Sequence, residues 1–198
     1  DFADPVSAVI SQGTGTLSGG TTVTAVAGVA TFSDLAYSAT ADGEALHLQF
    51  DDVLTGSGGD LAAVTTEELT ADIVATQLIL TQTPADNRVV DASDEVVSNL
   101  PFALQPVISA RDAAGVLDAD FADVVTASRG AGAGVLSGGQ SVTAAAGVAT
   151  FIDLAYLASA DGEAFTLTFD DETSGVGGDP STISTGELSA DVVATQLV

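Results

Sequence analysis

The sequence predicts an all-β protein built from tandem β-sandwich repeats. A long segment of the chain recurs without gaps at a spacing of 119 residues. Apolar and polar residues alternate along many short segments that are rich in Val, Thr and Phe, which is typical of half-buried strands. Gly, Asp and Asn interrupt these segments roughly every ten residues, as turns do. No helix is expected, because Ala is interspersed with Val, Thr and Gly, which disfavour helix interiors.

The internal repeat is the strongest of these observations. When residues 1–79 are aligned with residues 120–198, 49 of the 79 positions are identical. The motif AGVATF begins at Ala27 and again at Ala146, and VATQL begins at Val74 and again at Val193. Self-similarity at a fixed period is the signature of a repeat architecture.

The period sets the predicted domain organisation. Residues 1–75 form an incomplete repeat that lacks its first two strands, residues 76–194 form a complete repeat, and residues 195–198 begin the next one. We therefore expect the chain to be a piece cut from a longer array.

Seven candidate strands can be placed in the complete repeat, and seven to nine antiparallel strands are expected there in all, arranged as a sandwich of two sheets. The apolar Phe165 and Phe169 alternate with Thr166, so one face of that strand is predicted to be buried. The only histidine, His47, aligns with Thr166 and is expected to face solvent. The predicted strands cover residues 76–83, 103–111, 122–128, 140–145, 147–152, 163–170 and 187–195.

Two arrangements remain open for the incomplete repeat. In the first, residues upstream in an intact array complete 1–75, and 76–111 pairs with strands of 120–198. In the second, 76–119 folds back onto 1–75, and 120–198 is left open to a strand from the next molecule. The first is the order that we expect.

The charge excludes several classes of partner. The chain has 28 acidic residues, three arginines and no lysine, for a formal charge of −25. Nucleic acids and anionic membrane surfaces need a cationic face, which this chain lacks. A compact chain with this charge repels itself unless salt screens it or divalent cations bind. Both conditions point to a saline environment outside a cell.

The residue inventory argues against catalysis. The chain has one histidine and no cysteine. A carboxylate pair can hydrolyse a glycoside, and Asp170 and Asp171 are the obvious pair. Adjacent residues on a strand point to opposite faces, however. We therefore expect no enzyme activity, no catalytic residue and no organic cofactor.

Calcium is the one cofactor that the sequence suggests. Ca²⁺ takes six to eight oxygen ligands, many of them carboxylates. Acidic residues cluster and partly repeat, including Asp42 with Glu44 and their counterparts Asp161 with Glu163. The alternative is a salt-adapted acidic surface in which Asp-Gly serves as turn chemistry. The candidate metal ligands are Asp51, Asp52, Asp60, Asp112, Asp118, Asp120, Asp123, Asp170, Asp171 and Asp179.

Three stretches resemble a known family. They read LQPVISARDAAG at 104–115, GVLSGGQSVTAAAGVATFIDLAY at 134–156 and ADGEAFTLTF at 160–169. In this order they are similar to the bacterial immunoglobulin-like (BIg-type) tandem repeats of large cell-surface adhesins and surface filament proteins. The resemblance implies a seven-strand sandwich, end-to-end stacking, secretion, and a role as stalk or spacer.

The expected function is thus an extracellular, cell-surface structural repeat that salt or calcium stabilises. Its expected partners are neighbouring repeats of the same protein or filament, and a host or surface ligand would be bound by another region of the full-length protein. One alternative is a module that binds a glycan or a protein, with Tyr37 and Tyr156 as the aromatic platform. Packing between or at the edges of sheets is the expected role of both tyrosines. Another alternative is a subunit of an S-layer, a sheath or a strand-exchanged fibre.

Overall fold

The protein is all-β. A computed structural model describes residues 2–52, 59–85, 95–171 and 178–193, and within them every regular element is a strand. This confirms the predicted fold class at the level of an all-β chain with several sheets. None of the described segments forms a helix with the length and apolarity needed to cross a membrane. The chain divides into two compact units, Asp1–Ile73 and Val74–Val198.

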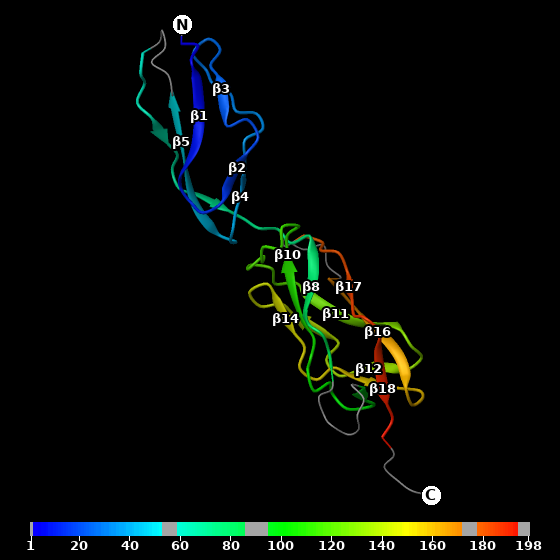
Figure 1. The fold of residues 1–198 in the computed structure, drawn as a ribbon. Helices are drawn as coiled ribbons and strands as arrows, with labels where there is room; N and C mark the ends of the chain where they lie inside the picture. Colours follow the sequence, from blue (N-terminus) through cyan, green and yellow to red (C-terminus); the bar gives the residue numbers. More distant parts are fainter. Residues whose placement is uncertain (1, 53–58, 86–94, 172–177, 194–198) are drawn as a thin grey trace, which may run out of the picture. The chain divides into compact units, whose positions relative to one another are not determined.

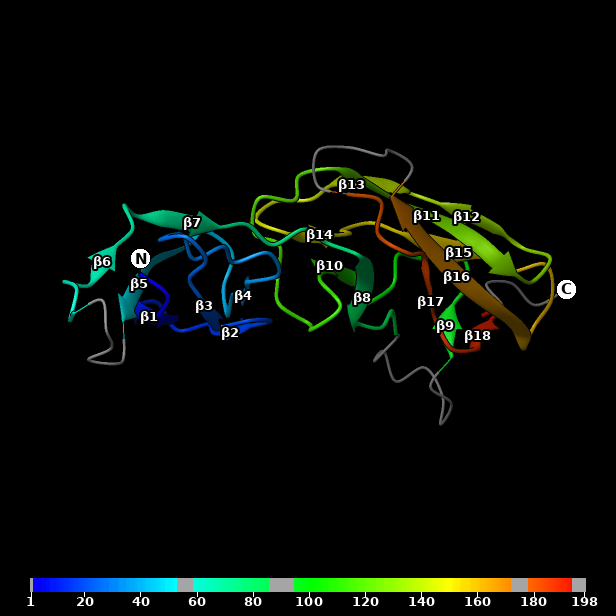
Figure 2. The same cartoon turned by 90° about the horizontal axis from the view of Figure 1, so that it is seen from above.

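The described strands of the first unit are β1 (Pro5–Gln12), β2 (Thr16–Ser18), β3 (Thr22–Thr24), β4 (Ala36–Ser38), β5 (Glu44–Asp52), β6 (Val64–Thr65) and β7 (Leu69–Ala71). They form a main sheet in the order β3-β1-β5-β6, with β7 also paired to β5, and a separate β2–β4 pair. Figure 1 labels β1 to β5 of this unit, and Figure 2 also labels β6 and β7. Every pair in the unit is antiparallel.

The described strands of the second unit are β8 (Gln77–Gln82), β9 (Val96–Val97), β10 (Val107–Arg111), β11 (Val124–Ala131), β12 (Val135–Ser137), β13 (Ser141–Thr143), β14 (Val148–Thr150), β15 (Ala155–Leu157), β16 (Glu163–Asp171), β17 (Ile183–Ser184) and β18 (Leu188–Asp191). They form a sheet in the order β13-β11-β16-β18-β9 with β17 on β16, a sheet β14-β10-β8, and a β12–β15 pair (Figure 2).

The sequence repeat is also a repeat of structure. All seven strands of the first unit recur in the second at the spacing of 119, from β1 and β11 to β7 and β18. The registers match as well: Val6 pairs with Asp52, and Val125 pairs with Asp171. Even the break in register is shared, since it follows Ile10 in β1 and Arg129 in β11. A bulge that recurs in this way is a built feature of the fold.

The segment 76–111 belongs to the second unit. β10 pairs with both β8 and β14, and β9 runs parallel to β18. This is the expected pairing with 120–198, while the described strands of the first unit pair only with one another.

The predicted strand set needs correction. Eleven strands lie in the described part of the second unit, where seven to nine antiparallel ones were expected, and the β9–β18 pair is parallel. The extra strands are two or three residues long, which is too short for an alternation pattern to reveal. The predicted start of another repeat at 195–198 lies outside the described residues.

One apolar core fills the second unit. Tyr156 stacks on Phe165 with ring centroids 3.8 Å apart, and Phe151 packs against Phe169 at 5.4 Å. Leu154 is fully buried among them. The core takes residues from both larger sheets, including Ile108 of β10 and residues of β11 and β16.

Candidate functional site

A tyrosine–glutamate pair recurs in both units. The Tyr156 hydroxyl donates to Glu163 Oε1 at 2.6 Å and accepts from the Gly134 N–H at 2.9 Å. In the first unit, the Tyr37 hydroxyl donates to Glu44 Oε1 at the same 2.6 Å. In both copies the tyrosine stands seven residues before the glutamate. The glutamate is the first residue of the long strand, β5 or β16.

The glutamate holds two turns together. Glu163 Oε1 also accepts the N–H groups of Ala133 and Gly134, at 2.5 and 2.7 Å. Its Oε2 accepts both the N–H and the hydroxyl of Ser159, at 2.5 and 2.8 Å. Glu44 accepts the corresponding set from Thr14, Gly15 and Thr40.

These bonds favour the ionised carboxylate. The hydrogen bond from Tyr156, followed by those from Ser159, holds the pKa of Glu163 well below its ordinary range. Tyr37 and the N–H groups of Thr14 and Thr40 do the same to the pKa of Glu44. Burial, then the bond to Glu163, raises the pKa of Tyr156. Each glutamate is therefore a structural anchor whose oxygens are occupied, and it is not poised as a general acid.

A glycine makes room for this network. Gly132 has φ of +101°, and a Cβ there would lie 2.5 Å from the Tyr156 hydroxyl oxygen. Gly13 stands in the same relation to Tyr37, at 2.7 Å with φ of +124°. An L-residue is disfavoured at both positions on both counts.

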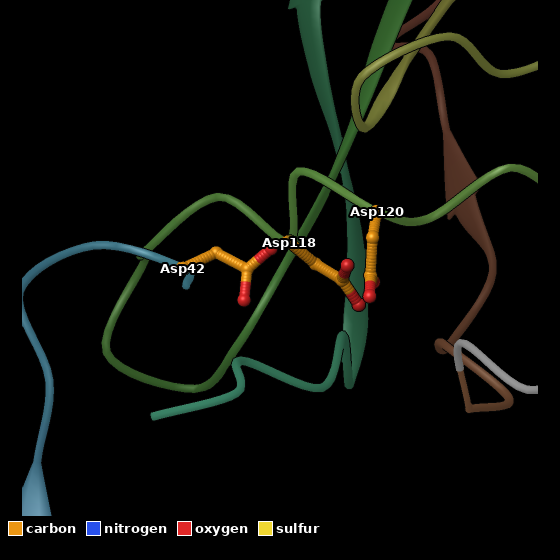
Figure 3. A group of neighbouring side chains, drawn as sticks. All are labelled: Asp42, Asp118 and Asp120. Atoms are coloured by element: carbon orange, nitrogen blue, oxygen red, sulfur yellow. The ribbon is translucent and has the colours of Figure 1, made fainter. Parts of the chain in front are cut away.

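Among the described carboxyl groups of the second unit, that of Asp118 is the most buried. It is fully buried, with Oδ2 accepting the Ala75 N–H at 2.8 Å and Oδ1 accepting the Phe121 N–H at 2.9 Å. Its carboxyl group points toward that of exposed Asp120 (Figure 3), and their oxygens lie within 4.8 Å. Burial, then a hydrogen bond with Asp120, raises the pKa of Asp118. The group ties the start of the unit to the entry of β11.

Asp42, which Figure 3 also labels, belongs to the first unit. Its Oδ1 accepts the Ile73 N–H at 3.0 Å, and Asp161 accepts the Val192 N–H at 3.1 Å in the second unit. Asp42 and Asp161 therefore have the same structural role, because each accepts a backbone N–H just after the last strand of its unit.

Each unit has two acidic residues at one end of its central ladder. Asp52 and Asp171 end β5 and β16 and are only 7% and 4% exposed. Asp4 and Asp123 stand immediately before β1 and β11. The Oδ2 atoms of Asp4 and Asp123 are buried and have no hydrogen-bond partner among the described residues. A buried carboxylate oxygen without a donor is energetically costly.

The other predicted ligands are dispersed. Asp112 Oδ1 accepts the N–H groups of Ala114 and Val116, so it caps its own turn. Asp60 and Asp179 are exposed and lie outside the strands, whereas Asp51 and Asp170 are half-buried on the strands. Within either unit taken alone, no three acidic or histidine ligands of the described residues lie within 4.8 Å of one another. Calcium binding therefore stays a prediction.

The structure bears on the expected roles of two side chains. Tyr156 is fully buried and stacked on Phe165, which agrees with the expected packing role and leaves no exposed ring there for a sugar. His47, expected to face solvent, is half-buried, and its Nδ1 donates to the Thr66 carbonyl at 3.0 Å. The tyrosine–glutamate pair was not found from the sequence, although identical residues at an identical spacing in two copies were its signal.

The comparisons with known proteins are sparse. The sequence matches no protein-family model and no curated protein. Among solved structures, a β-glycosidase from Bacteroides vulgatus aligns with 96% of this chain and 21% of its own chain, at 11% identity and a TM-score of 0.38. At that TM-score the likeness carries no argument about fold or activity.

Proposed function

We propose that this chain is a non-catalytic structural repeat of the stalk or spacer of a bacterial adhesin or cell-surface filament, located outside the cell. One observation carries the proposal. Two copies share their strands, registers and bulge at a constant spacing of 119 residues. A chain that repeats one structural unit at a constant spacing is suited to adding length.

The immunoglobulin-like form of the fold is part of this proposal. In the second unit, the sheets β14-β10-β8 and β13-β11-β16-β18-β9 contribute to the same core, as the layers of a β-sandwich do. The LSGG and GVATF motifs lie at β12 and β14 in the complete unit. These features support the resemblance to bacterial immunoglobulin-like repeats.

The use of polar side chains supports the absence of catalysis. Glu163 accepts hydrogen bonds on both oxygens from the protein itself, and Asp118 does the same. His47 donates to a backbone carbonyl. Groups employed in this way fix turns and strand ends, and they present no base beside a nucleophile.

The test is how the length of an array depends on the number of repeats. Arrays of two, four and eight copies of residues 74–192 are compared by small-angle X-ray scattering. A spacer requires the maximum dimension to grow in proportion to repeat number. Growth as the square root of that number, which is typical of flexible chains, would contradict the proposal. An array in which each unit carries Leu154→Asp, designed to lose its core, is the control.

A further inference from the structure

The two units differ in what covers their cores. In the second unit, β8, β9 and β10 contribute Leu78, Val96 and Ile108, which are at most 2% exposed. In the described part of the first unit, no strand corresponds to any of these three. The first unit therefore has the face against which β8, β9 and β10 pack in the second unit, but no described strand covers it.

The residues on this face are identical in the two copies. In the second unit they are buried or half-buried, whereas in the first unit all are half-buried or exposed, with Val29 at 62% and Leu69 at 42%. We name this surface the open face. It consists of Phe2, Val29, Phe32, Leu35, Tyr37 and Leu69, which correspond to Phe121, Val148, Phe151, Leu154, Tyr156 and Leu188.

In the second unit, backbone groups beside the residues that correspond to the open face also form hydrogen bonds with the segment 74–119. The Asn99 N–H donates to the Tyr156 carbonyl at 2.8 Å, and the Phe102 N–H donates to the Leu154 carbonyl at 3.0 Å. β14 adds a ladder to β10 through three residue pairs. The first unit offers the same residues at its corresponding edge, where 29–31 form no strand. Such an edge is a template for strand addition.

We propose that the open face is an acceptor site for a polypeptide segment with the sequence pattern of 74–119, which completes Asp1–Ile73 by occupying the places of β8, β9 and β10. The second unit identifies the occupant, because it holds this segment on the same residues. In a second copy of the chain, 74–119 is engaged with its own unit, where its effective concentration is high. The occupant is therefore an additional segment. This inference rests on the fold and does not depend on the stalk function.

The test adds a synthetic peptide of residues 74–119 to the full chain. We expect one peptide to bind per chain by calorimetry, and hydrogen exchange to slow at 29–32 and 69–72. A peptide carrying Ile108→Asp is the matched control. It should bind on the order of a hundredfold more weakly, because an aspartate would be buried without a partner.

A fusion protein tests the same proposal without depending on the solubility of a free peptide. An extra copy of 74–119 is placed before Asp1, which recreates the natural junction because Asp1 and Asp120 are the same residue type. Exchange at 29–32 should slow in this chain, and Ile108→Asp in the extra copy should abolish the effect. Unchanged exchange at 29–32 in this fusion would overturn the proposal. So would equal binding of both peptides, protection confined to the second unit, or self-association of the chain that the peptide does not displace.

Discussion

At the scale of single residues, both copies retain the tyrosine–glutamate pair. Replacing Tyr156 by Phe keeps the ring on Phe165 and removes the hydroxyl that links Glu163 to Gly134. Gly134 keeps its other bond to Glu163, at 2.7 Å. We therefore expect a loss of about 1 to 2 kcal/mol in the unfolding free energy of the second unit, measured by urea denaturation. A variant as stable as the wild type would show that the hydroxyl is dispensable.

Glu163 also gives the protein a pH dependence. Because its pKa is lower in the folded state, the unfolded chain binds the proton more tightly. The stability that Glu163 contributes is thus fully present above the ordinary glutamate pKa of about 4.3 and is lost as the pH falls below it. Glu163→Gln should destabilise the unit at pH 7, and its difference from the wild type should shrink toward pH 3. Denaturation curves between pH 3 and 7 measure this, with exposed Glu187→Gln as control. A difference that does not change with pH would contradict the assignment.

At the scale of elements, the same sequence forms a strand in one unit and none in the other. Residues 148–150 are β14 because β10 lies beside them, whereas no strand of the described residues pairs with the identical 29–31. Ser109→Pro removes an N–H from the centre of β10, which is paired on both sides. We expect a loss of about 3 kcal/mol or more, and amide exchange at 148–150 that approaches that at 29–31.

Ser109→Ala is the matched control for this substitution. Its only expected loss is the bond that the Ser109 hydroxyl accepts from Arg111 Nε, at 2.9 Å. Protection at 148–150 should persist in this variant. If the alanine variant also loses protection, the buried side chain of Ser109, and not the backbone pairing, maintains β14.

The same contrast explains what the sequence predicts well and what it does not. Alternation places the long strand at 163–170, and the structure has it as Glu163–Asp171, because a nine-residue strand with one buried face carries its own pattern. β9 has two residues, and its partner β18 lies more than ninety positions later, so no local pattern reveals it. The candidate site behaves likewise. Acidic residues are visible in the sequence, but the use of Glu163 as an anchor depends on Tyr156 and on two separate turns.

At the scale of the whole molecule, two units with one plan should differ in stability. Leu154 is fully buried, whereas its equivalent Leu35 is half-buried. We expect Leu154→Ala to cost about 2 to 5 kcal/mol and Leu35→Ala to cost clearly less. Each should shift a different transition in a urea titration followed by hydrogen exchange. Equal effects on a single shared transition would show that the two units unfold together.

Because the chain has a formal charge of −25, its melting temperature should depend on the ions present. Charge screening by salt and specific binding of a cation can be measured separately. The Debye length falls from about 10 Å at 0.1 M salt to about 3 Å at 1 M, so the melting temperature should be lowest in EDTA at low ionic strength and rise in molar NaCl. At matched ionic strength, any further gain in melting temperature in CaCl₂ reports binding, which stabilises by about 2.7 kcal/mol at a hundredfold excess over Kd.

Asp123→Asn tests the buried Oδ2 directly, with exposed Asp179→Asn as its control. If a cation binds at Asp123, only the first substitution should remove the calcium gain, and both should leave the NaCl effect in place. A melting temperature that is equal under all these conditions would refute ionic stabilisation, because self-repulsion on this scale must respond to at least one of the two ions.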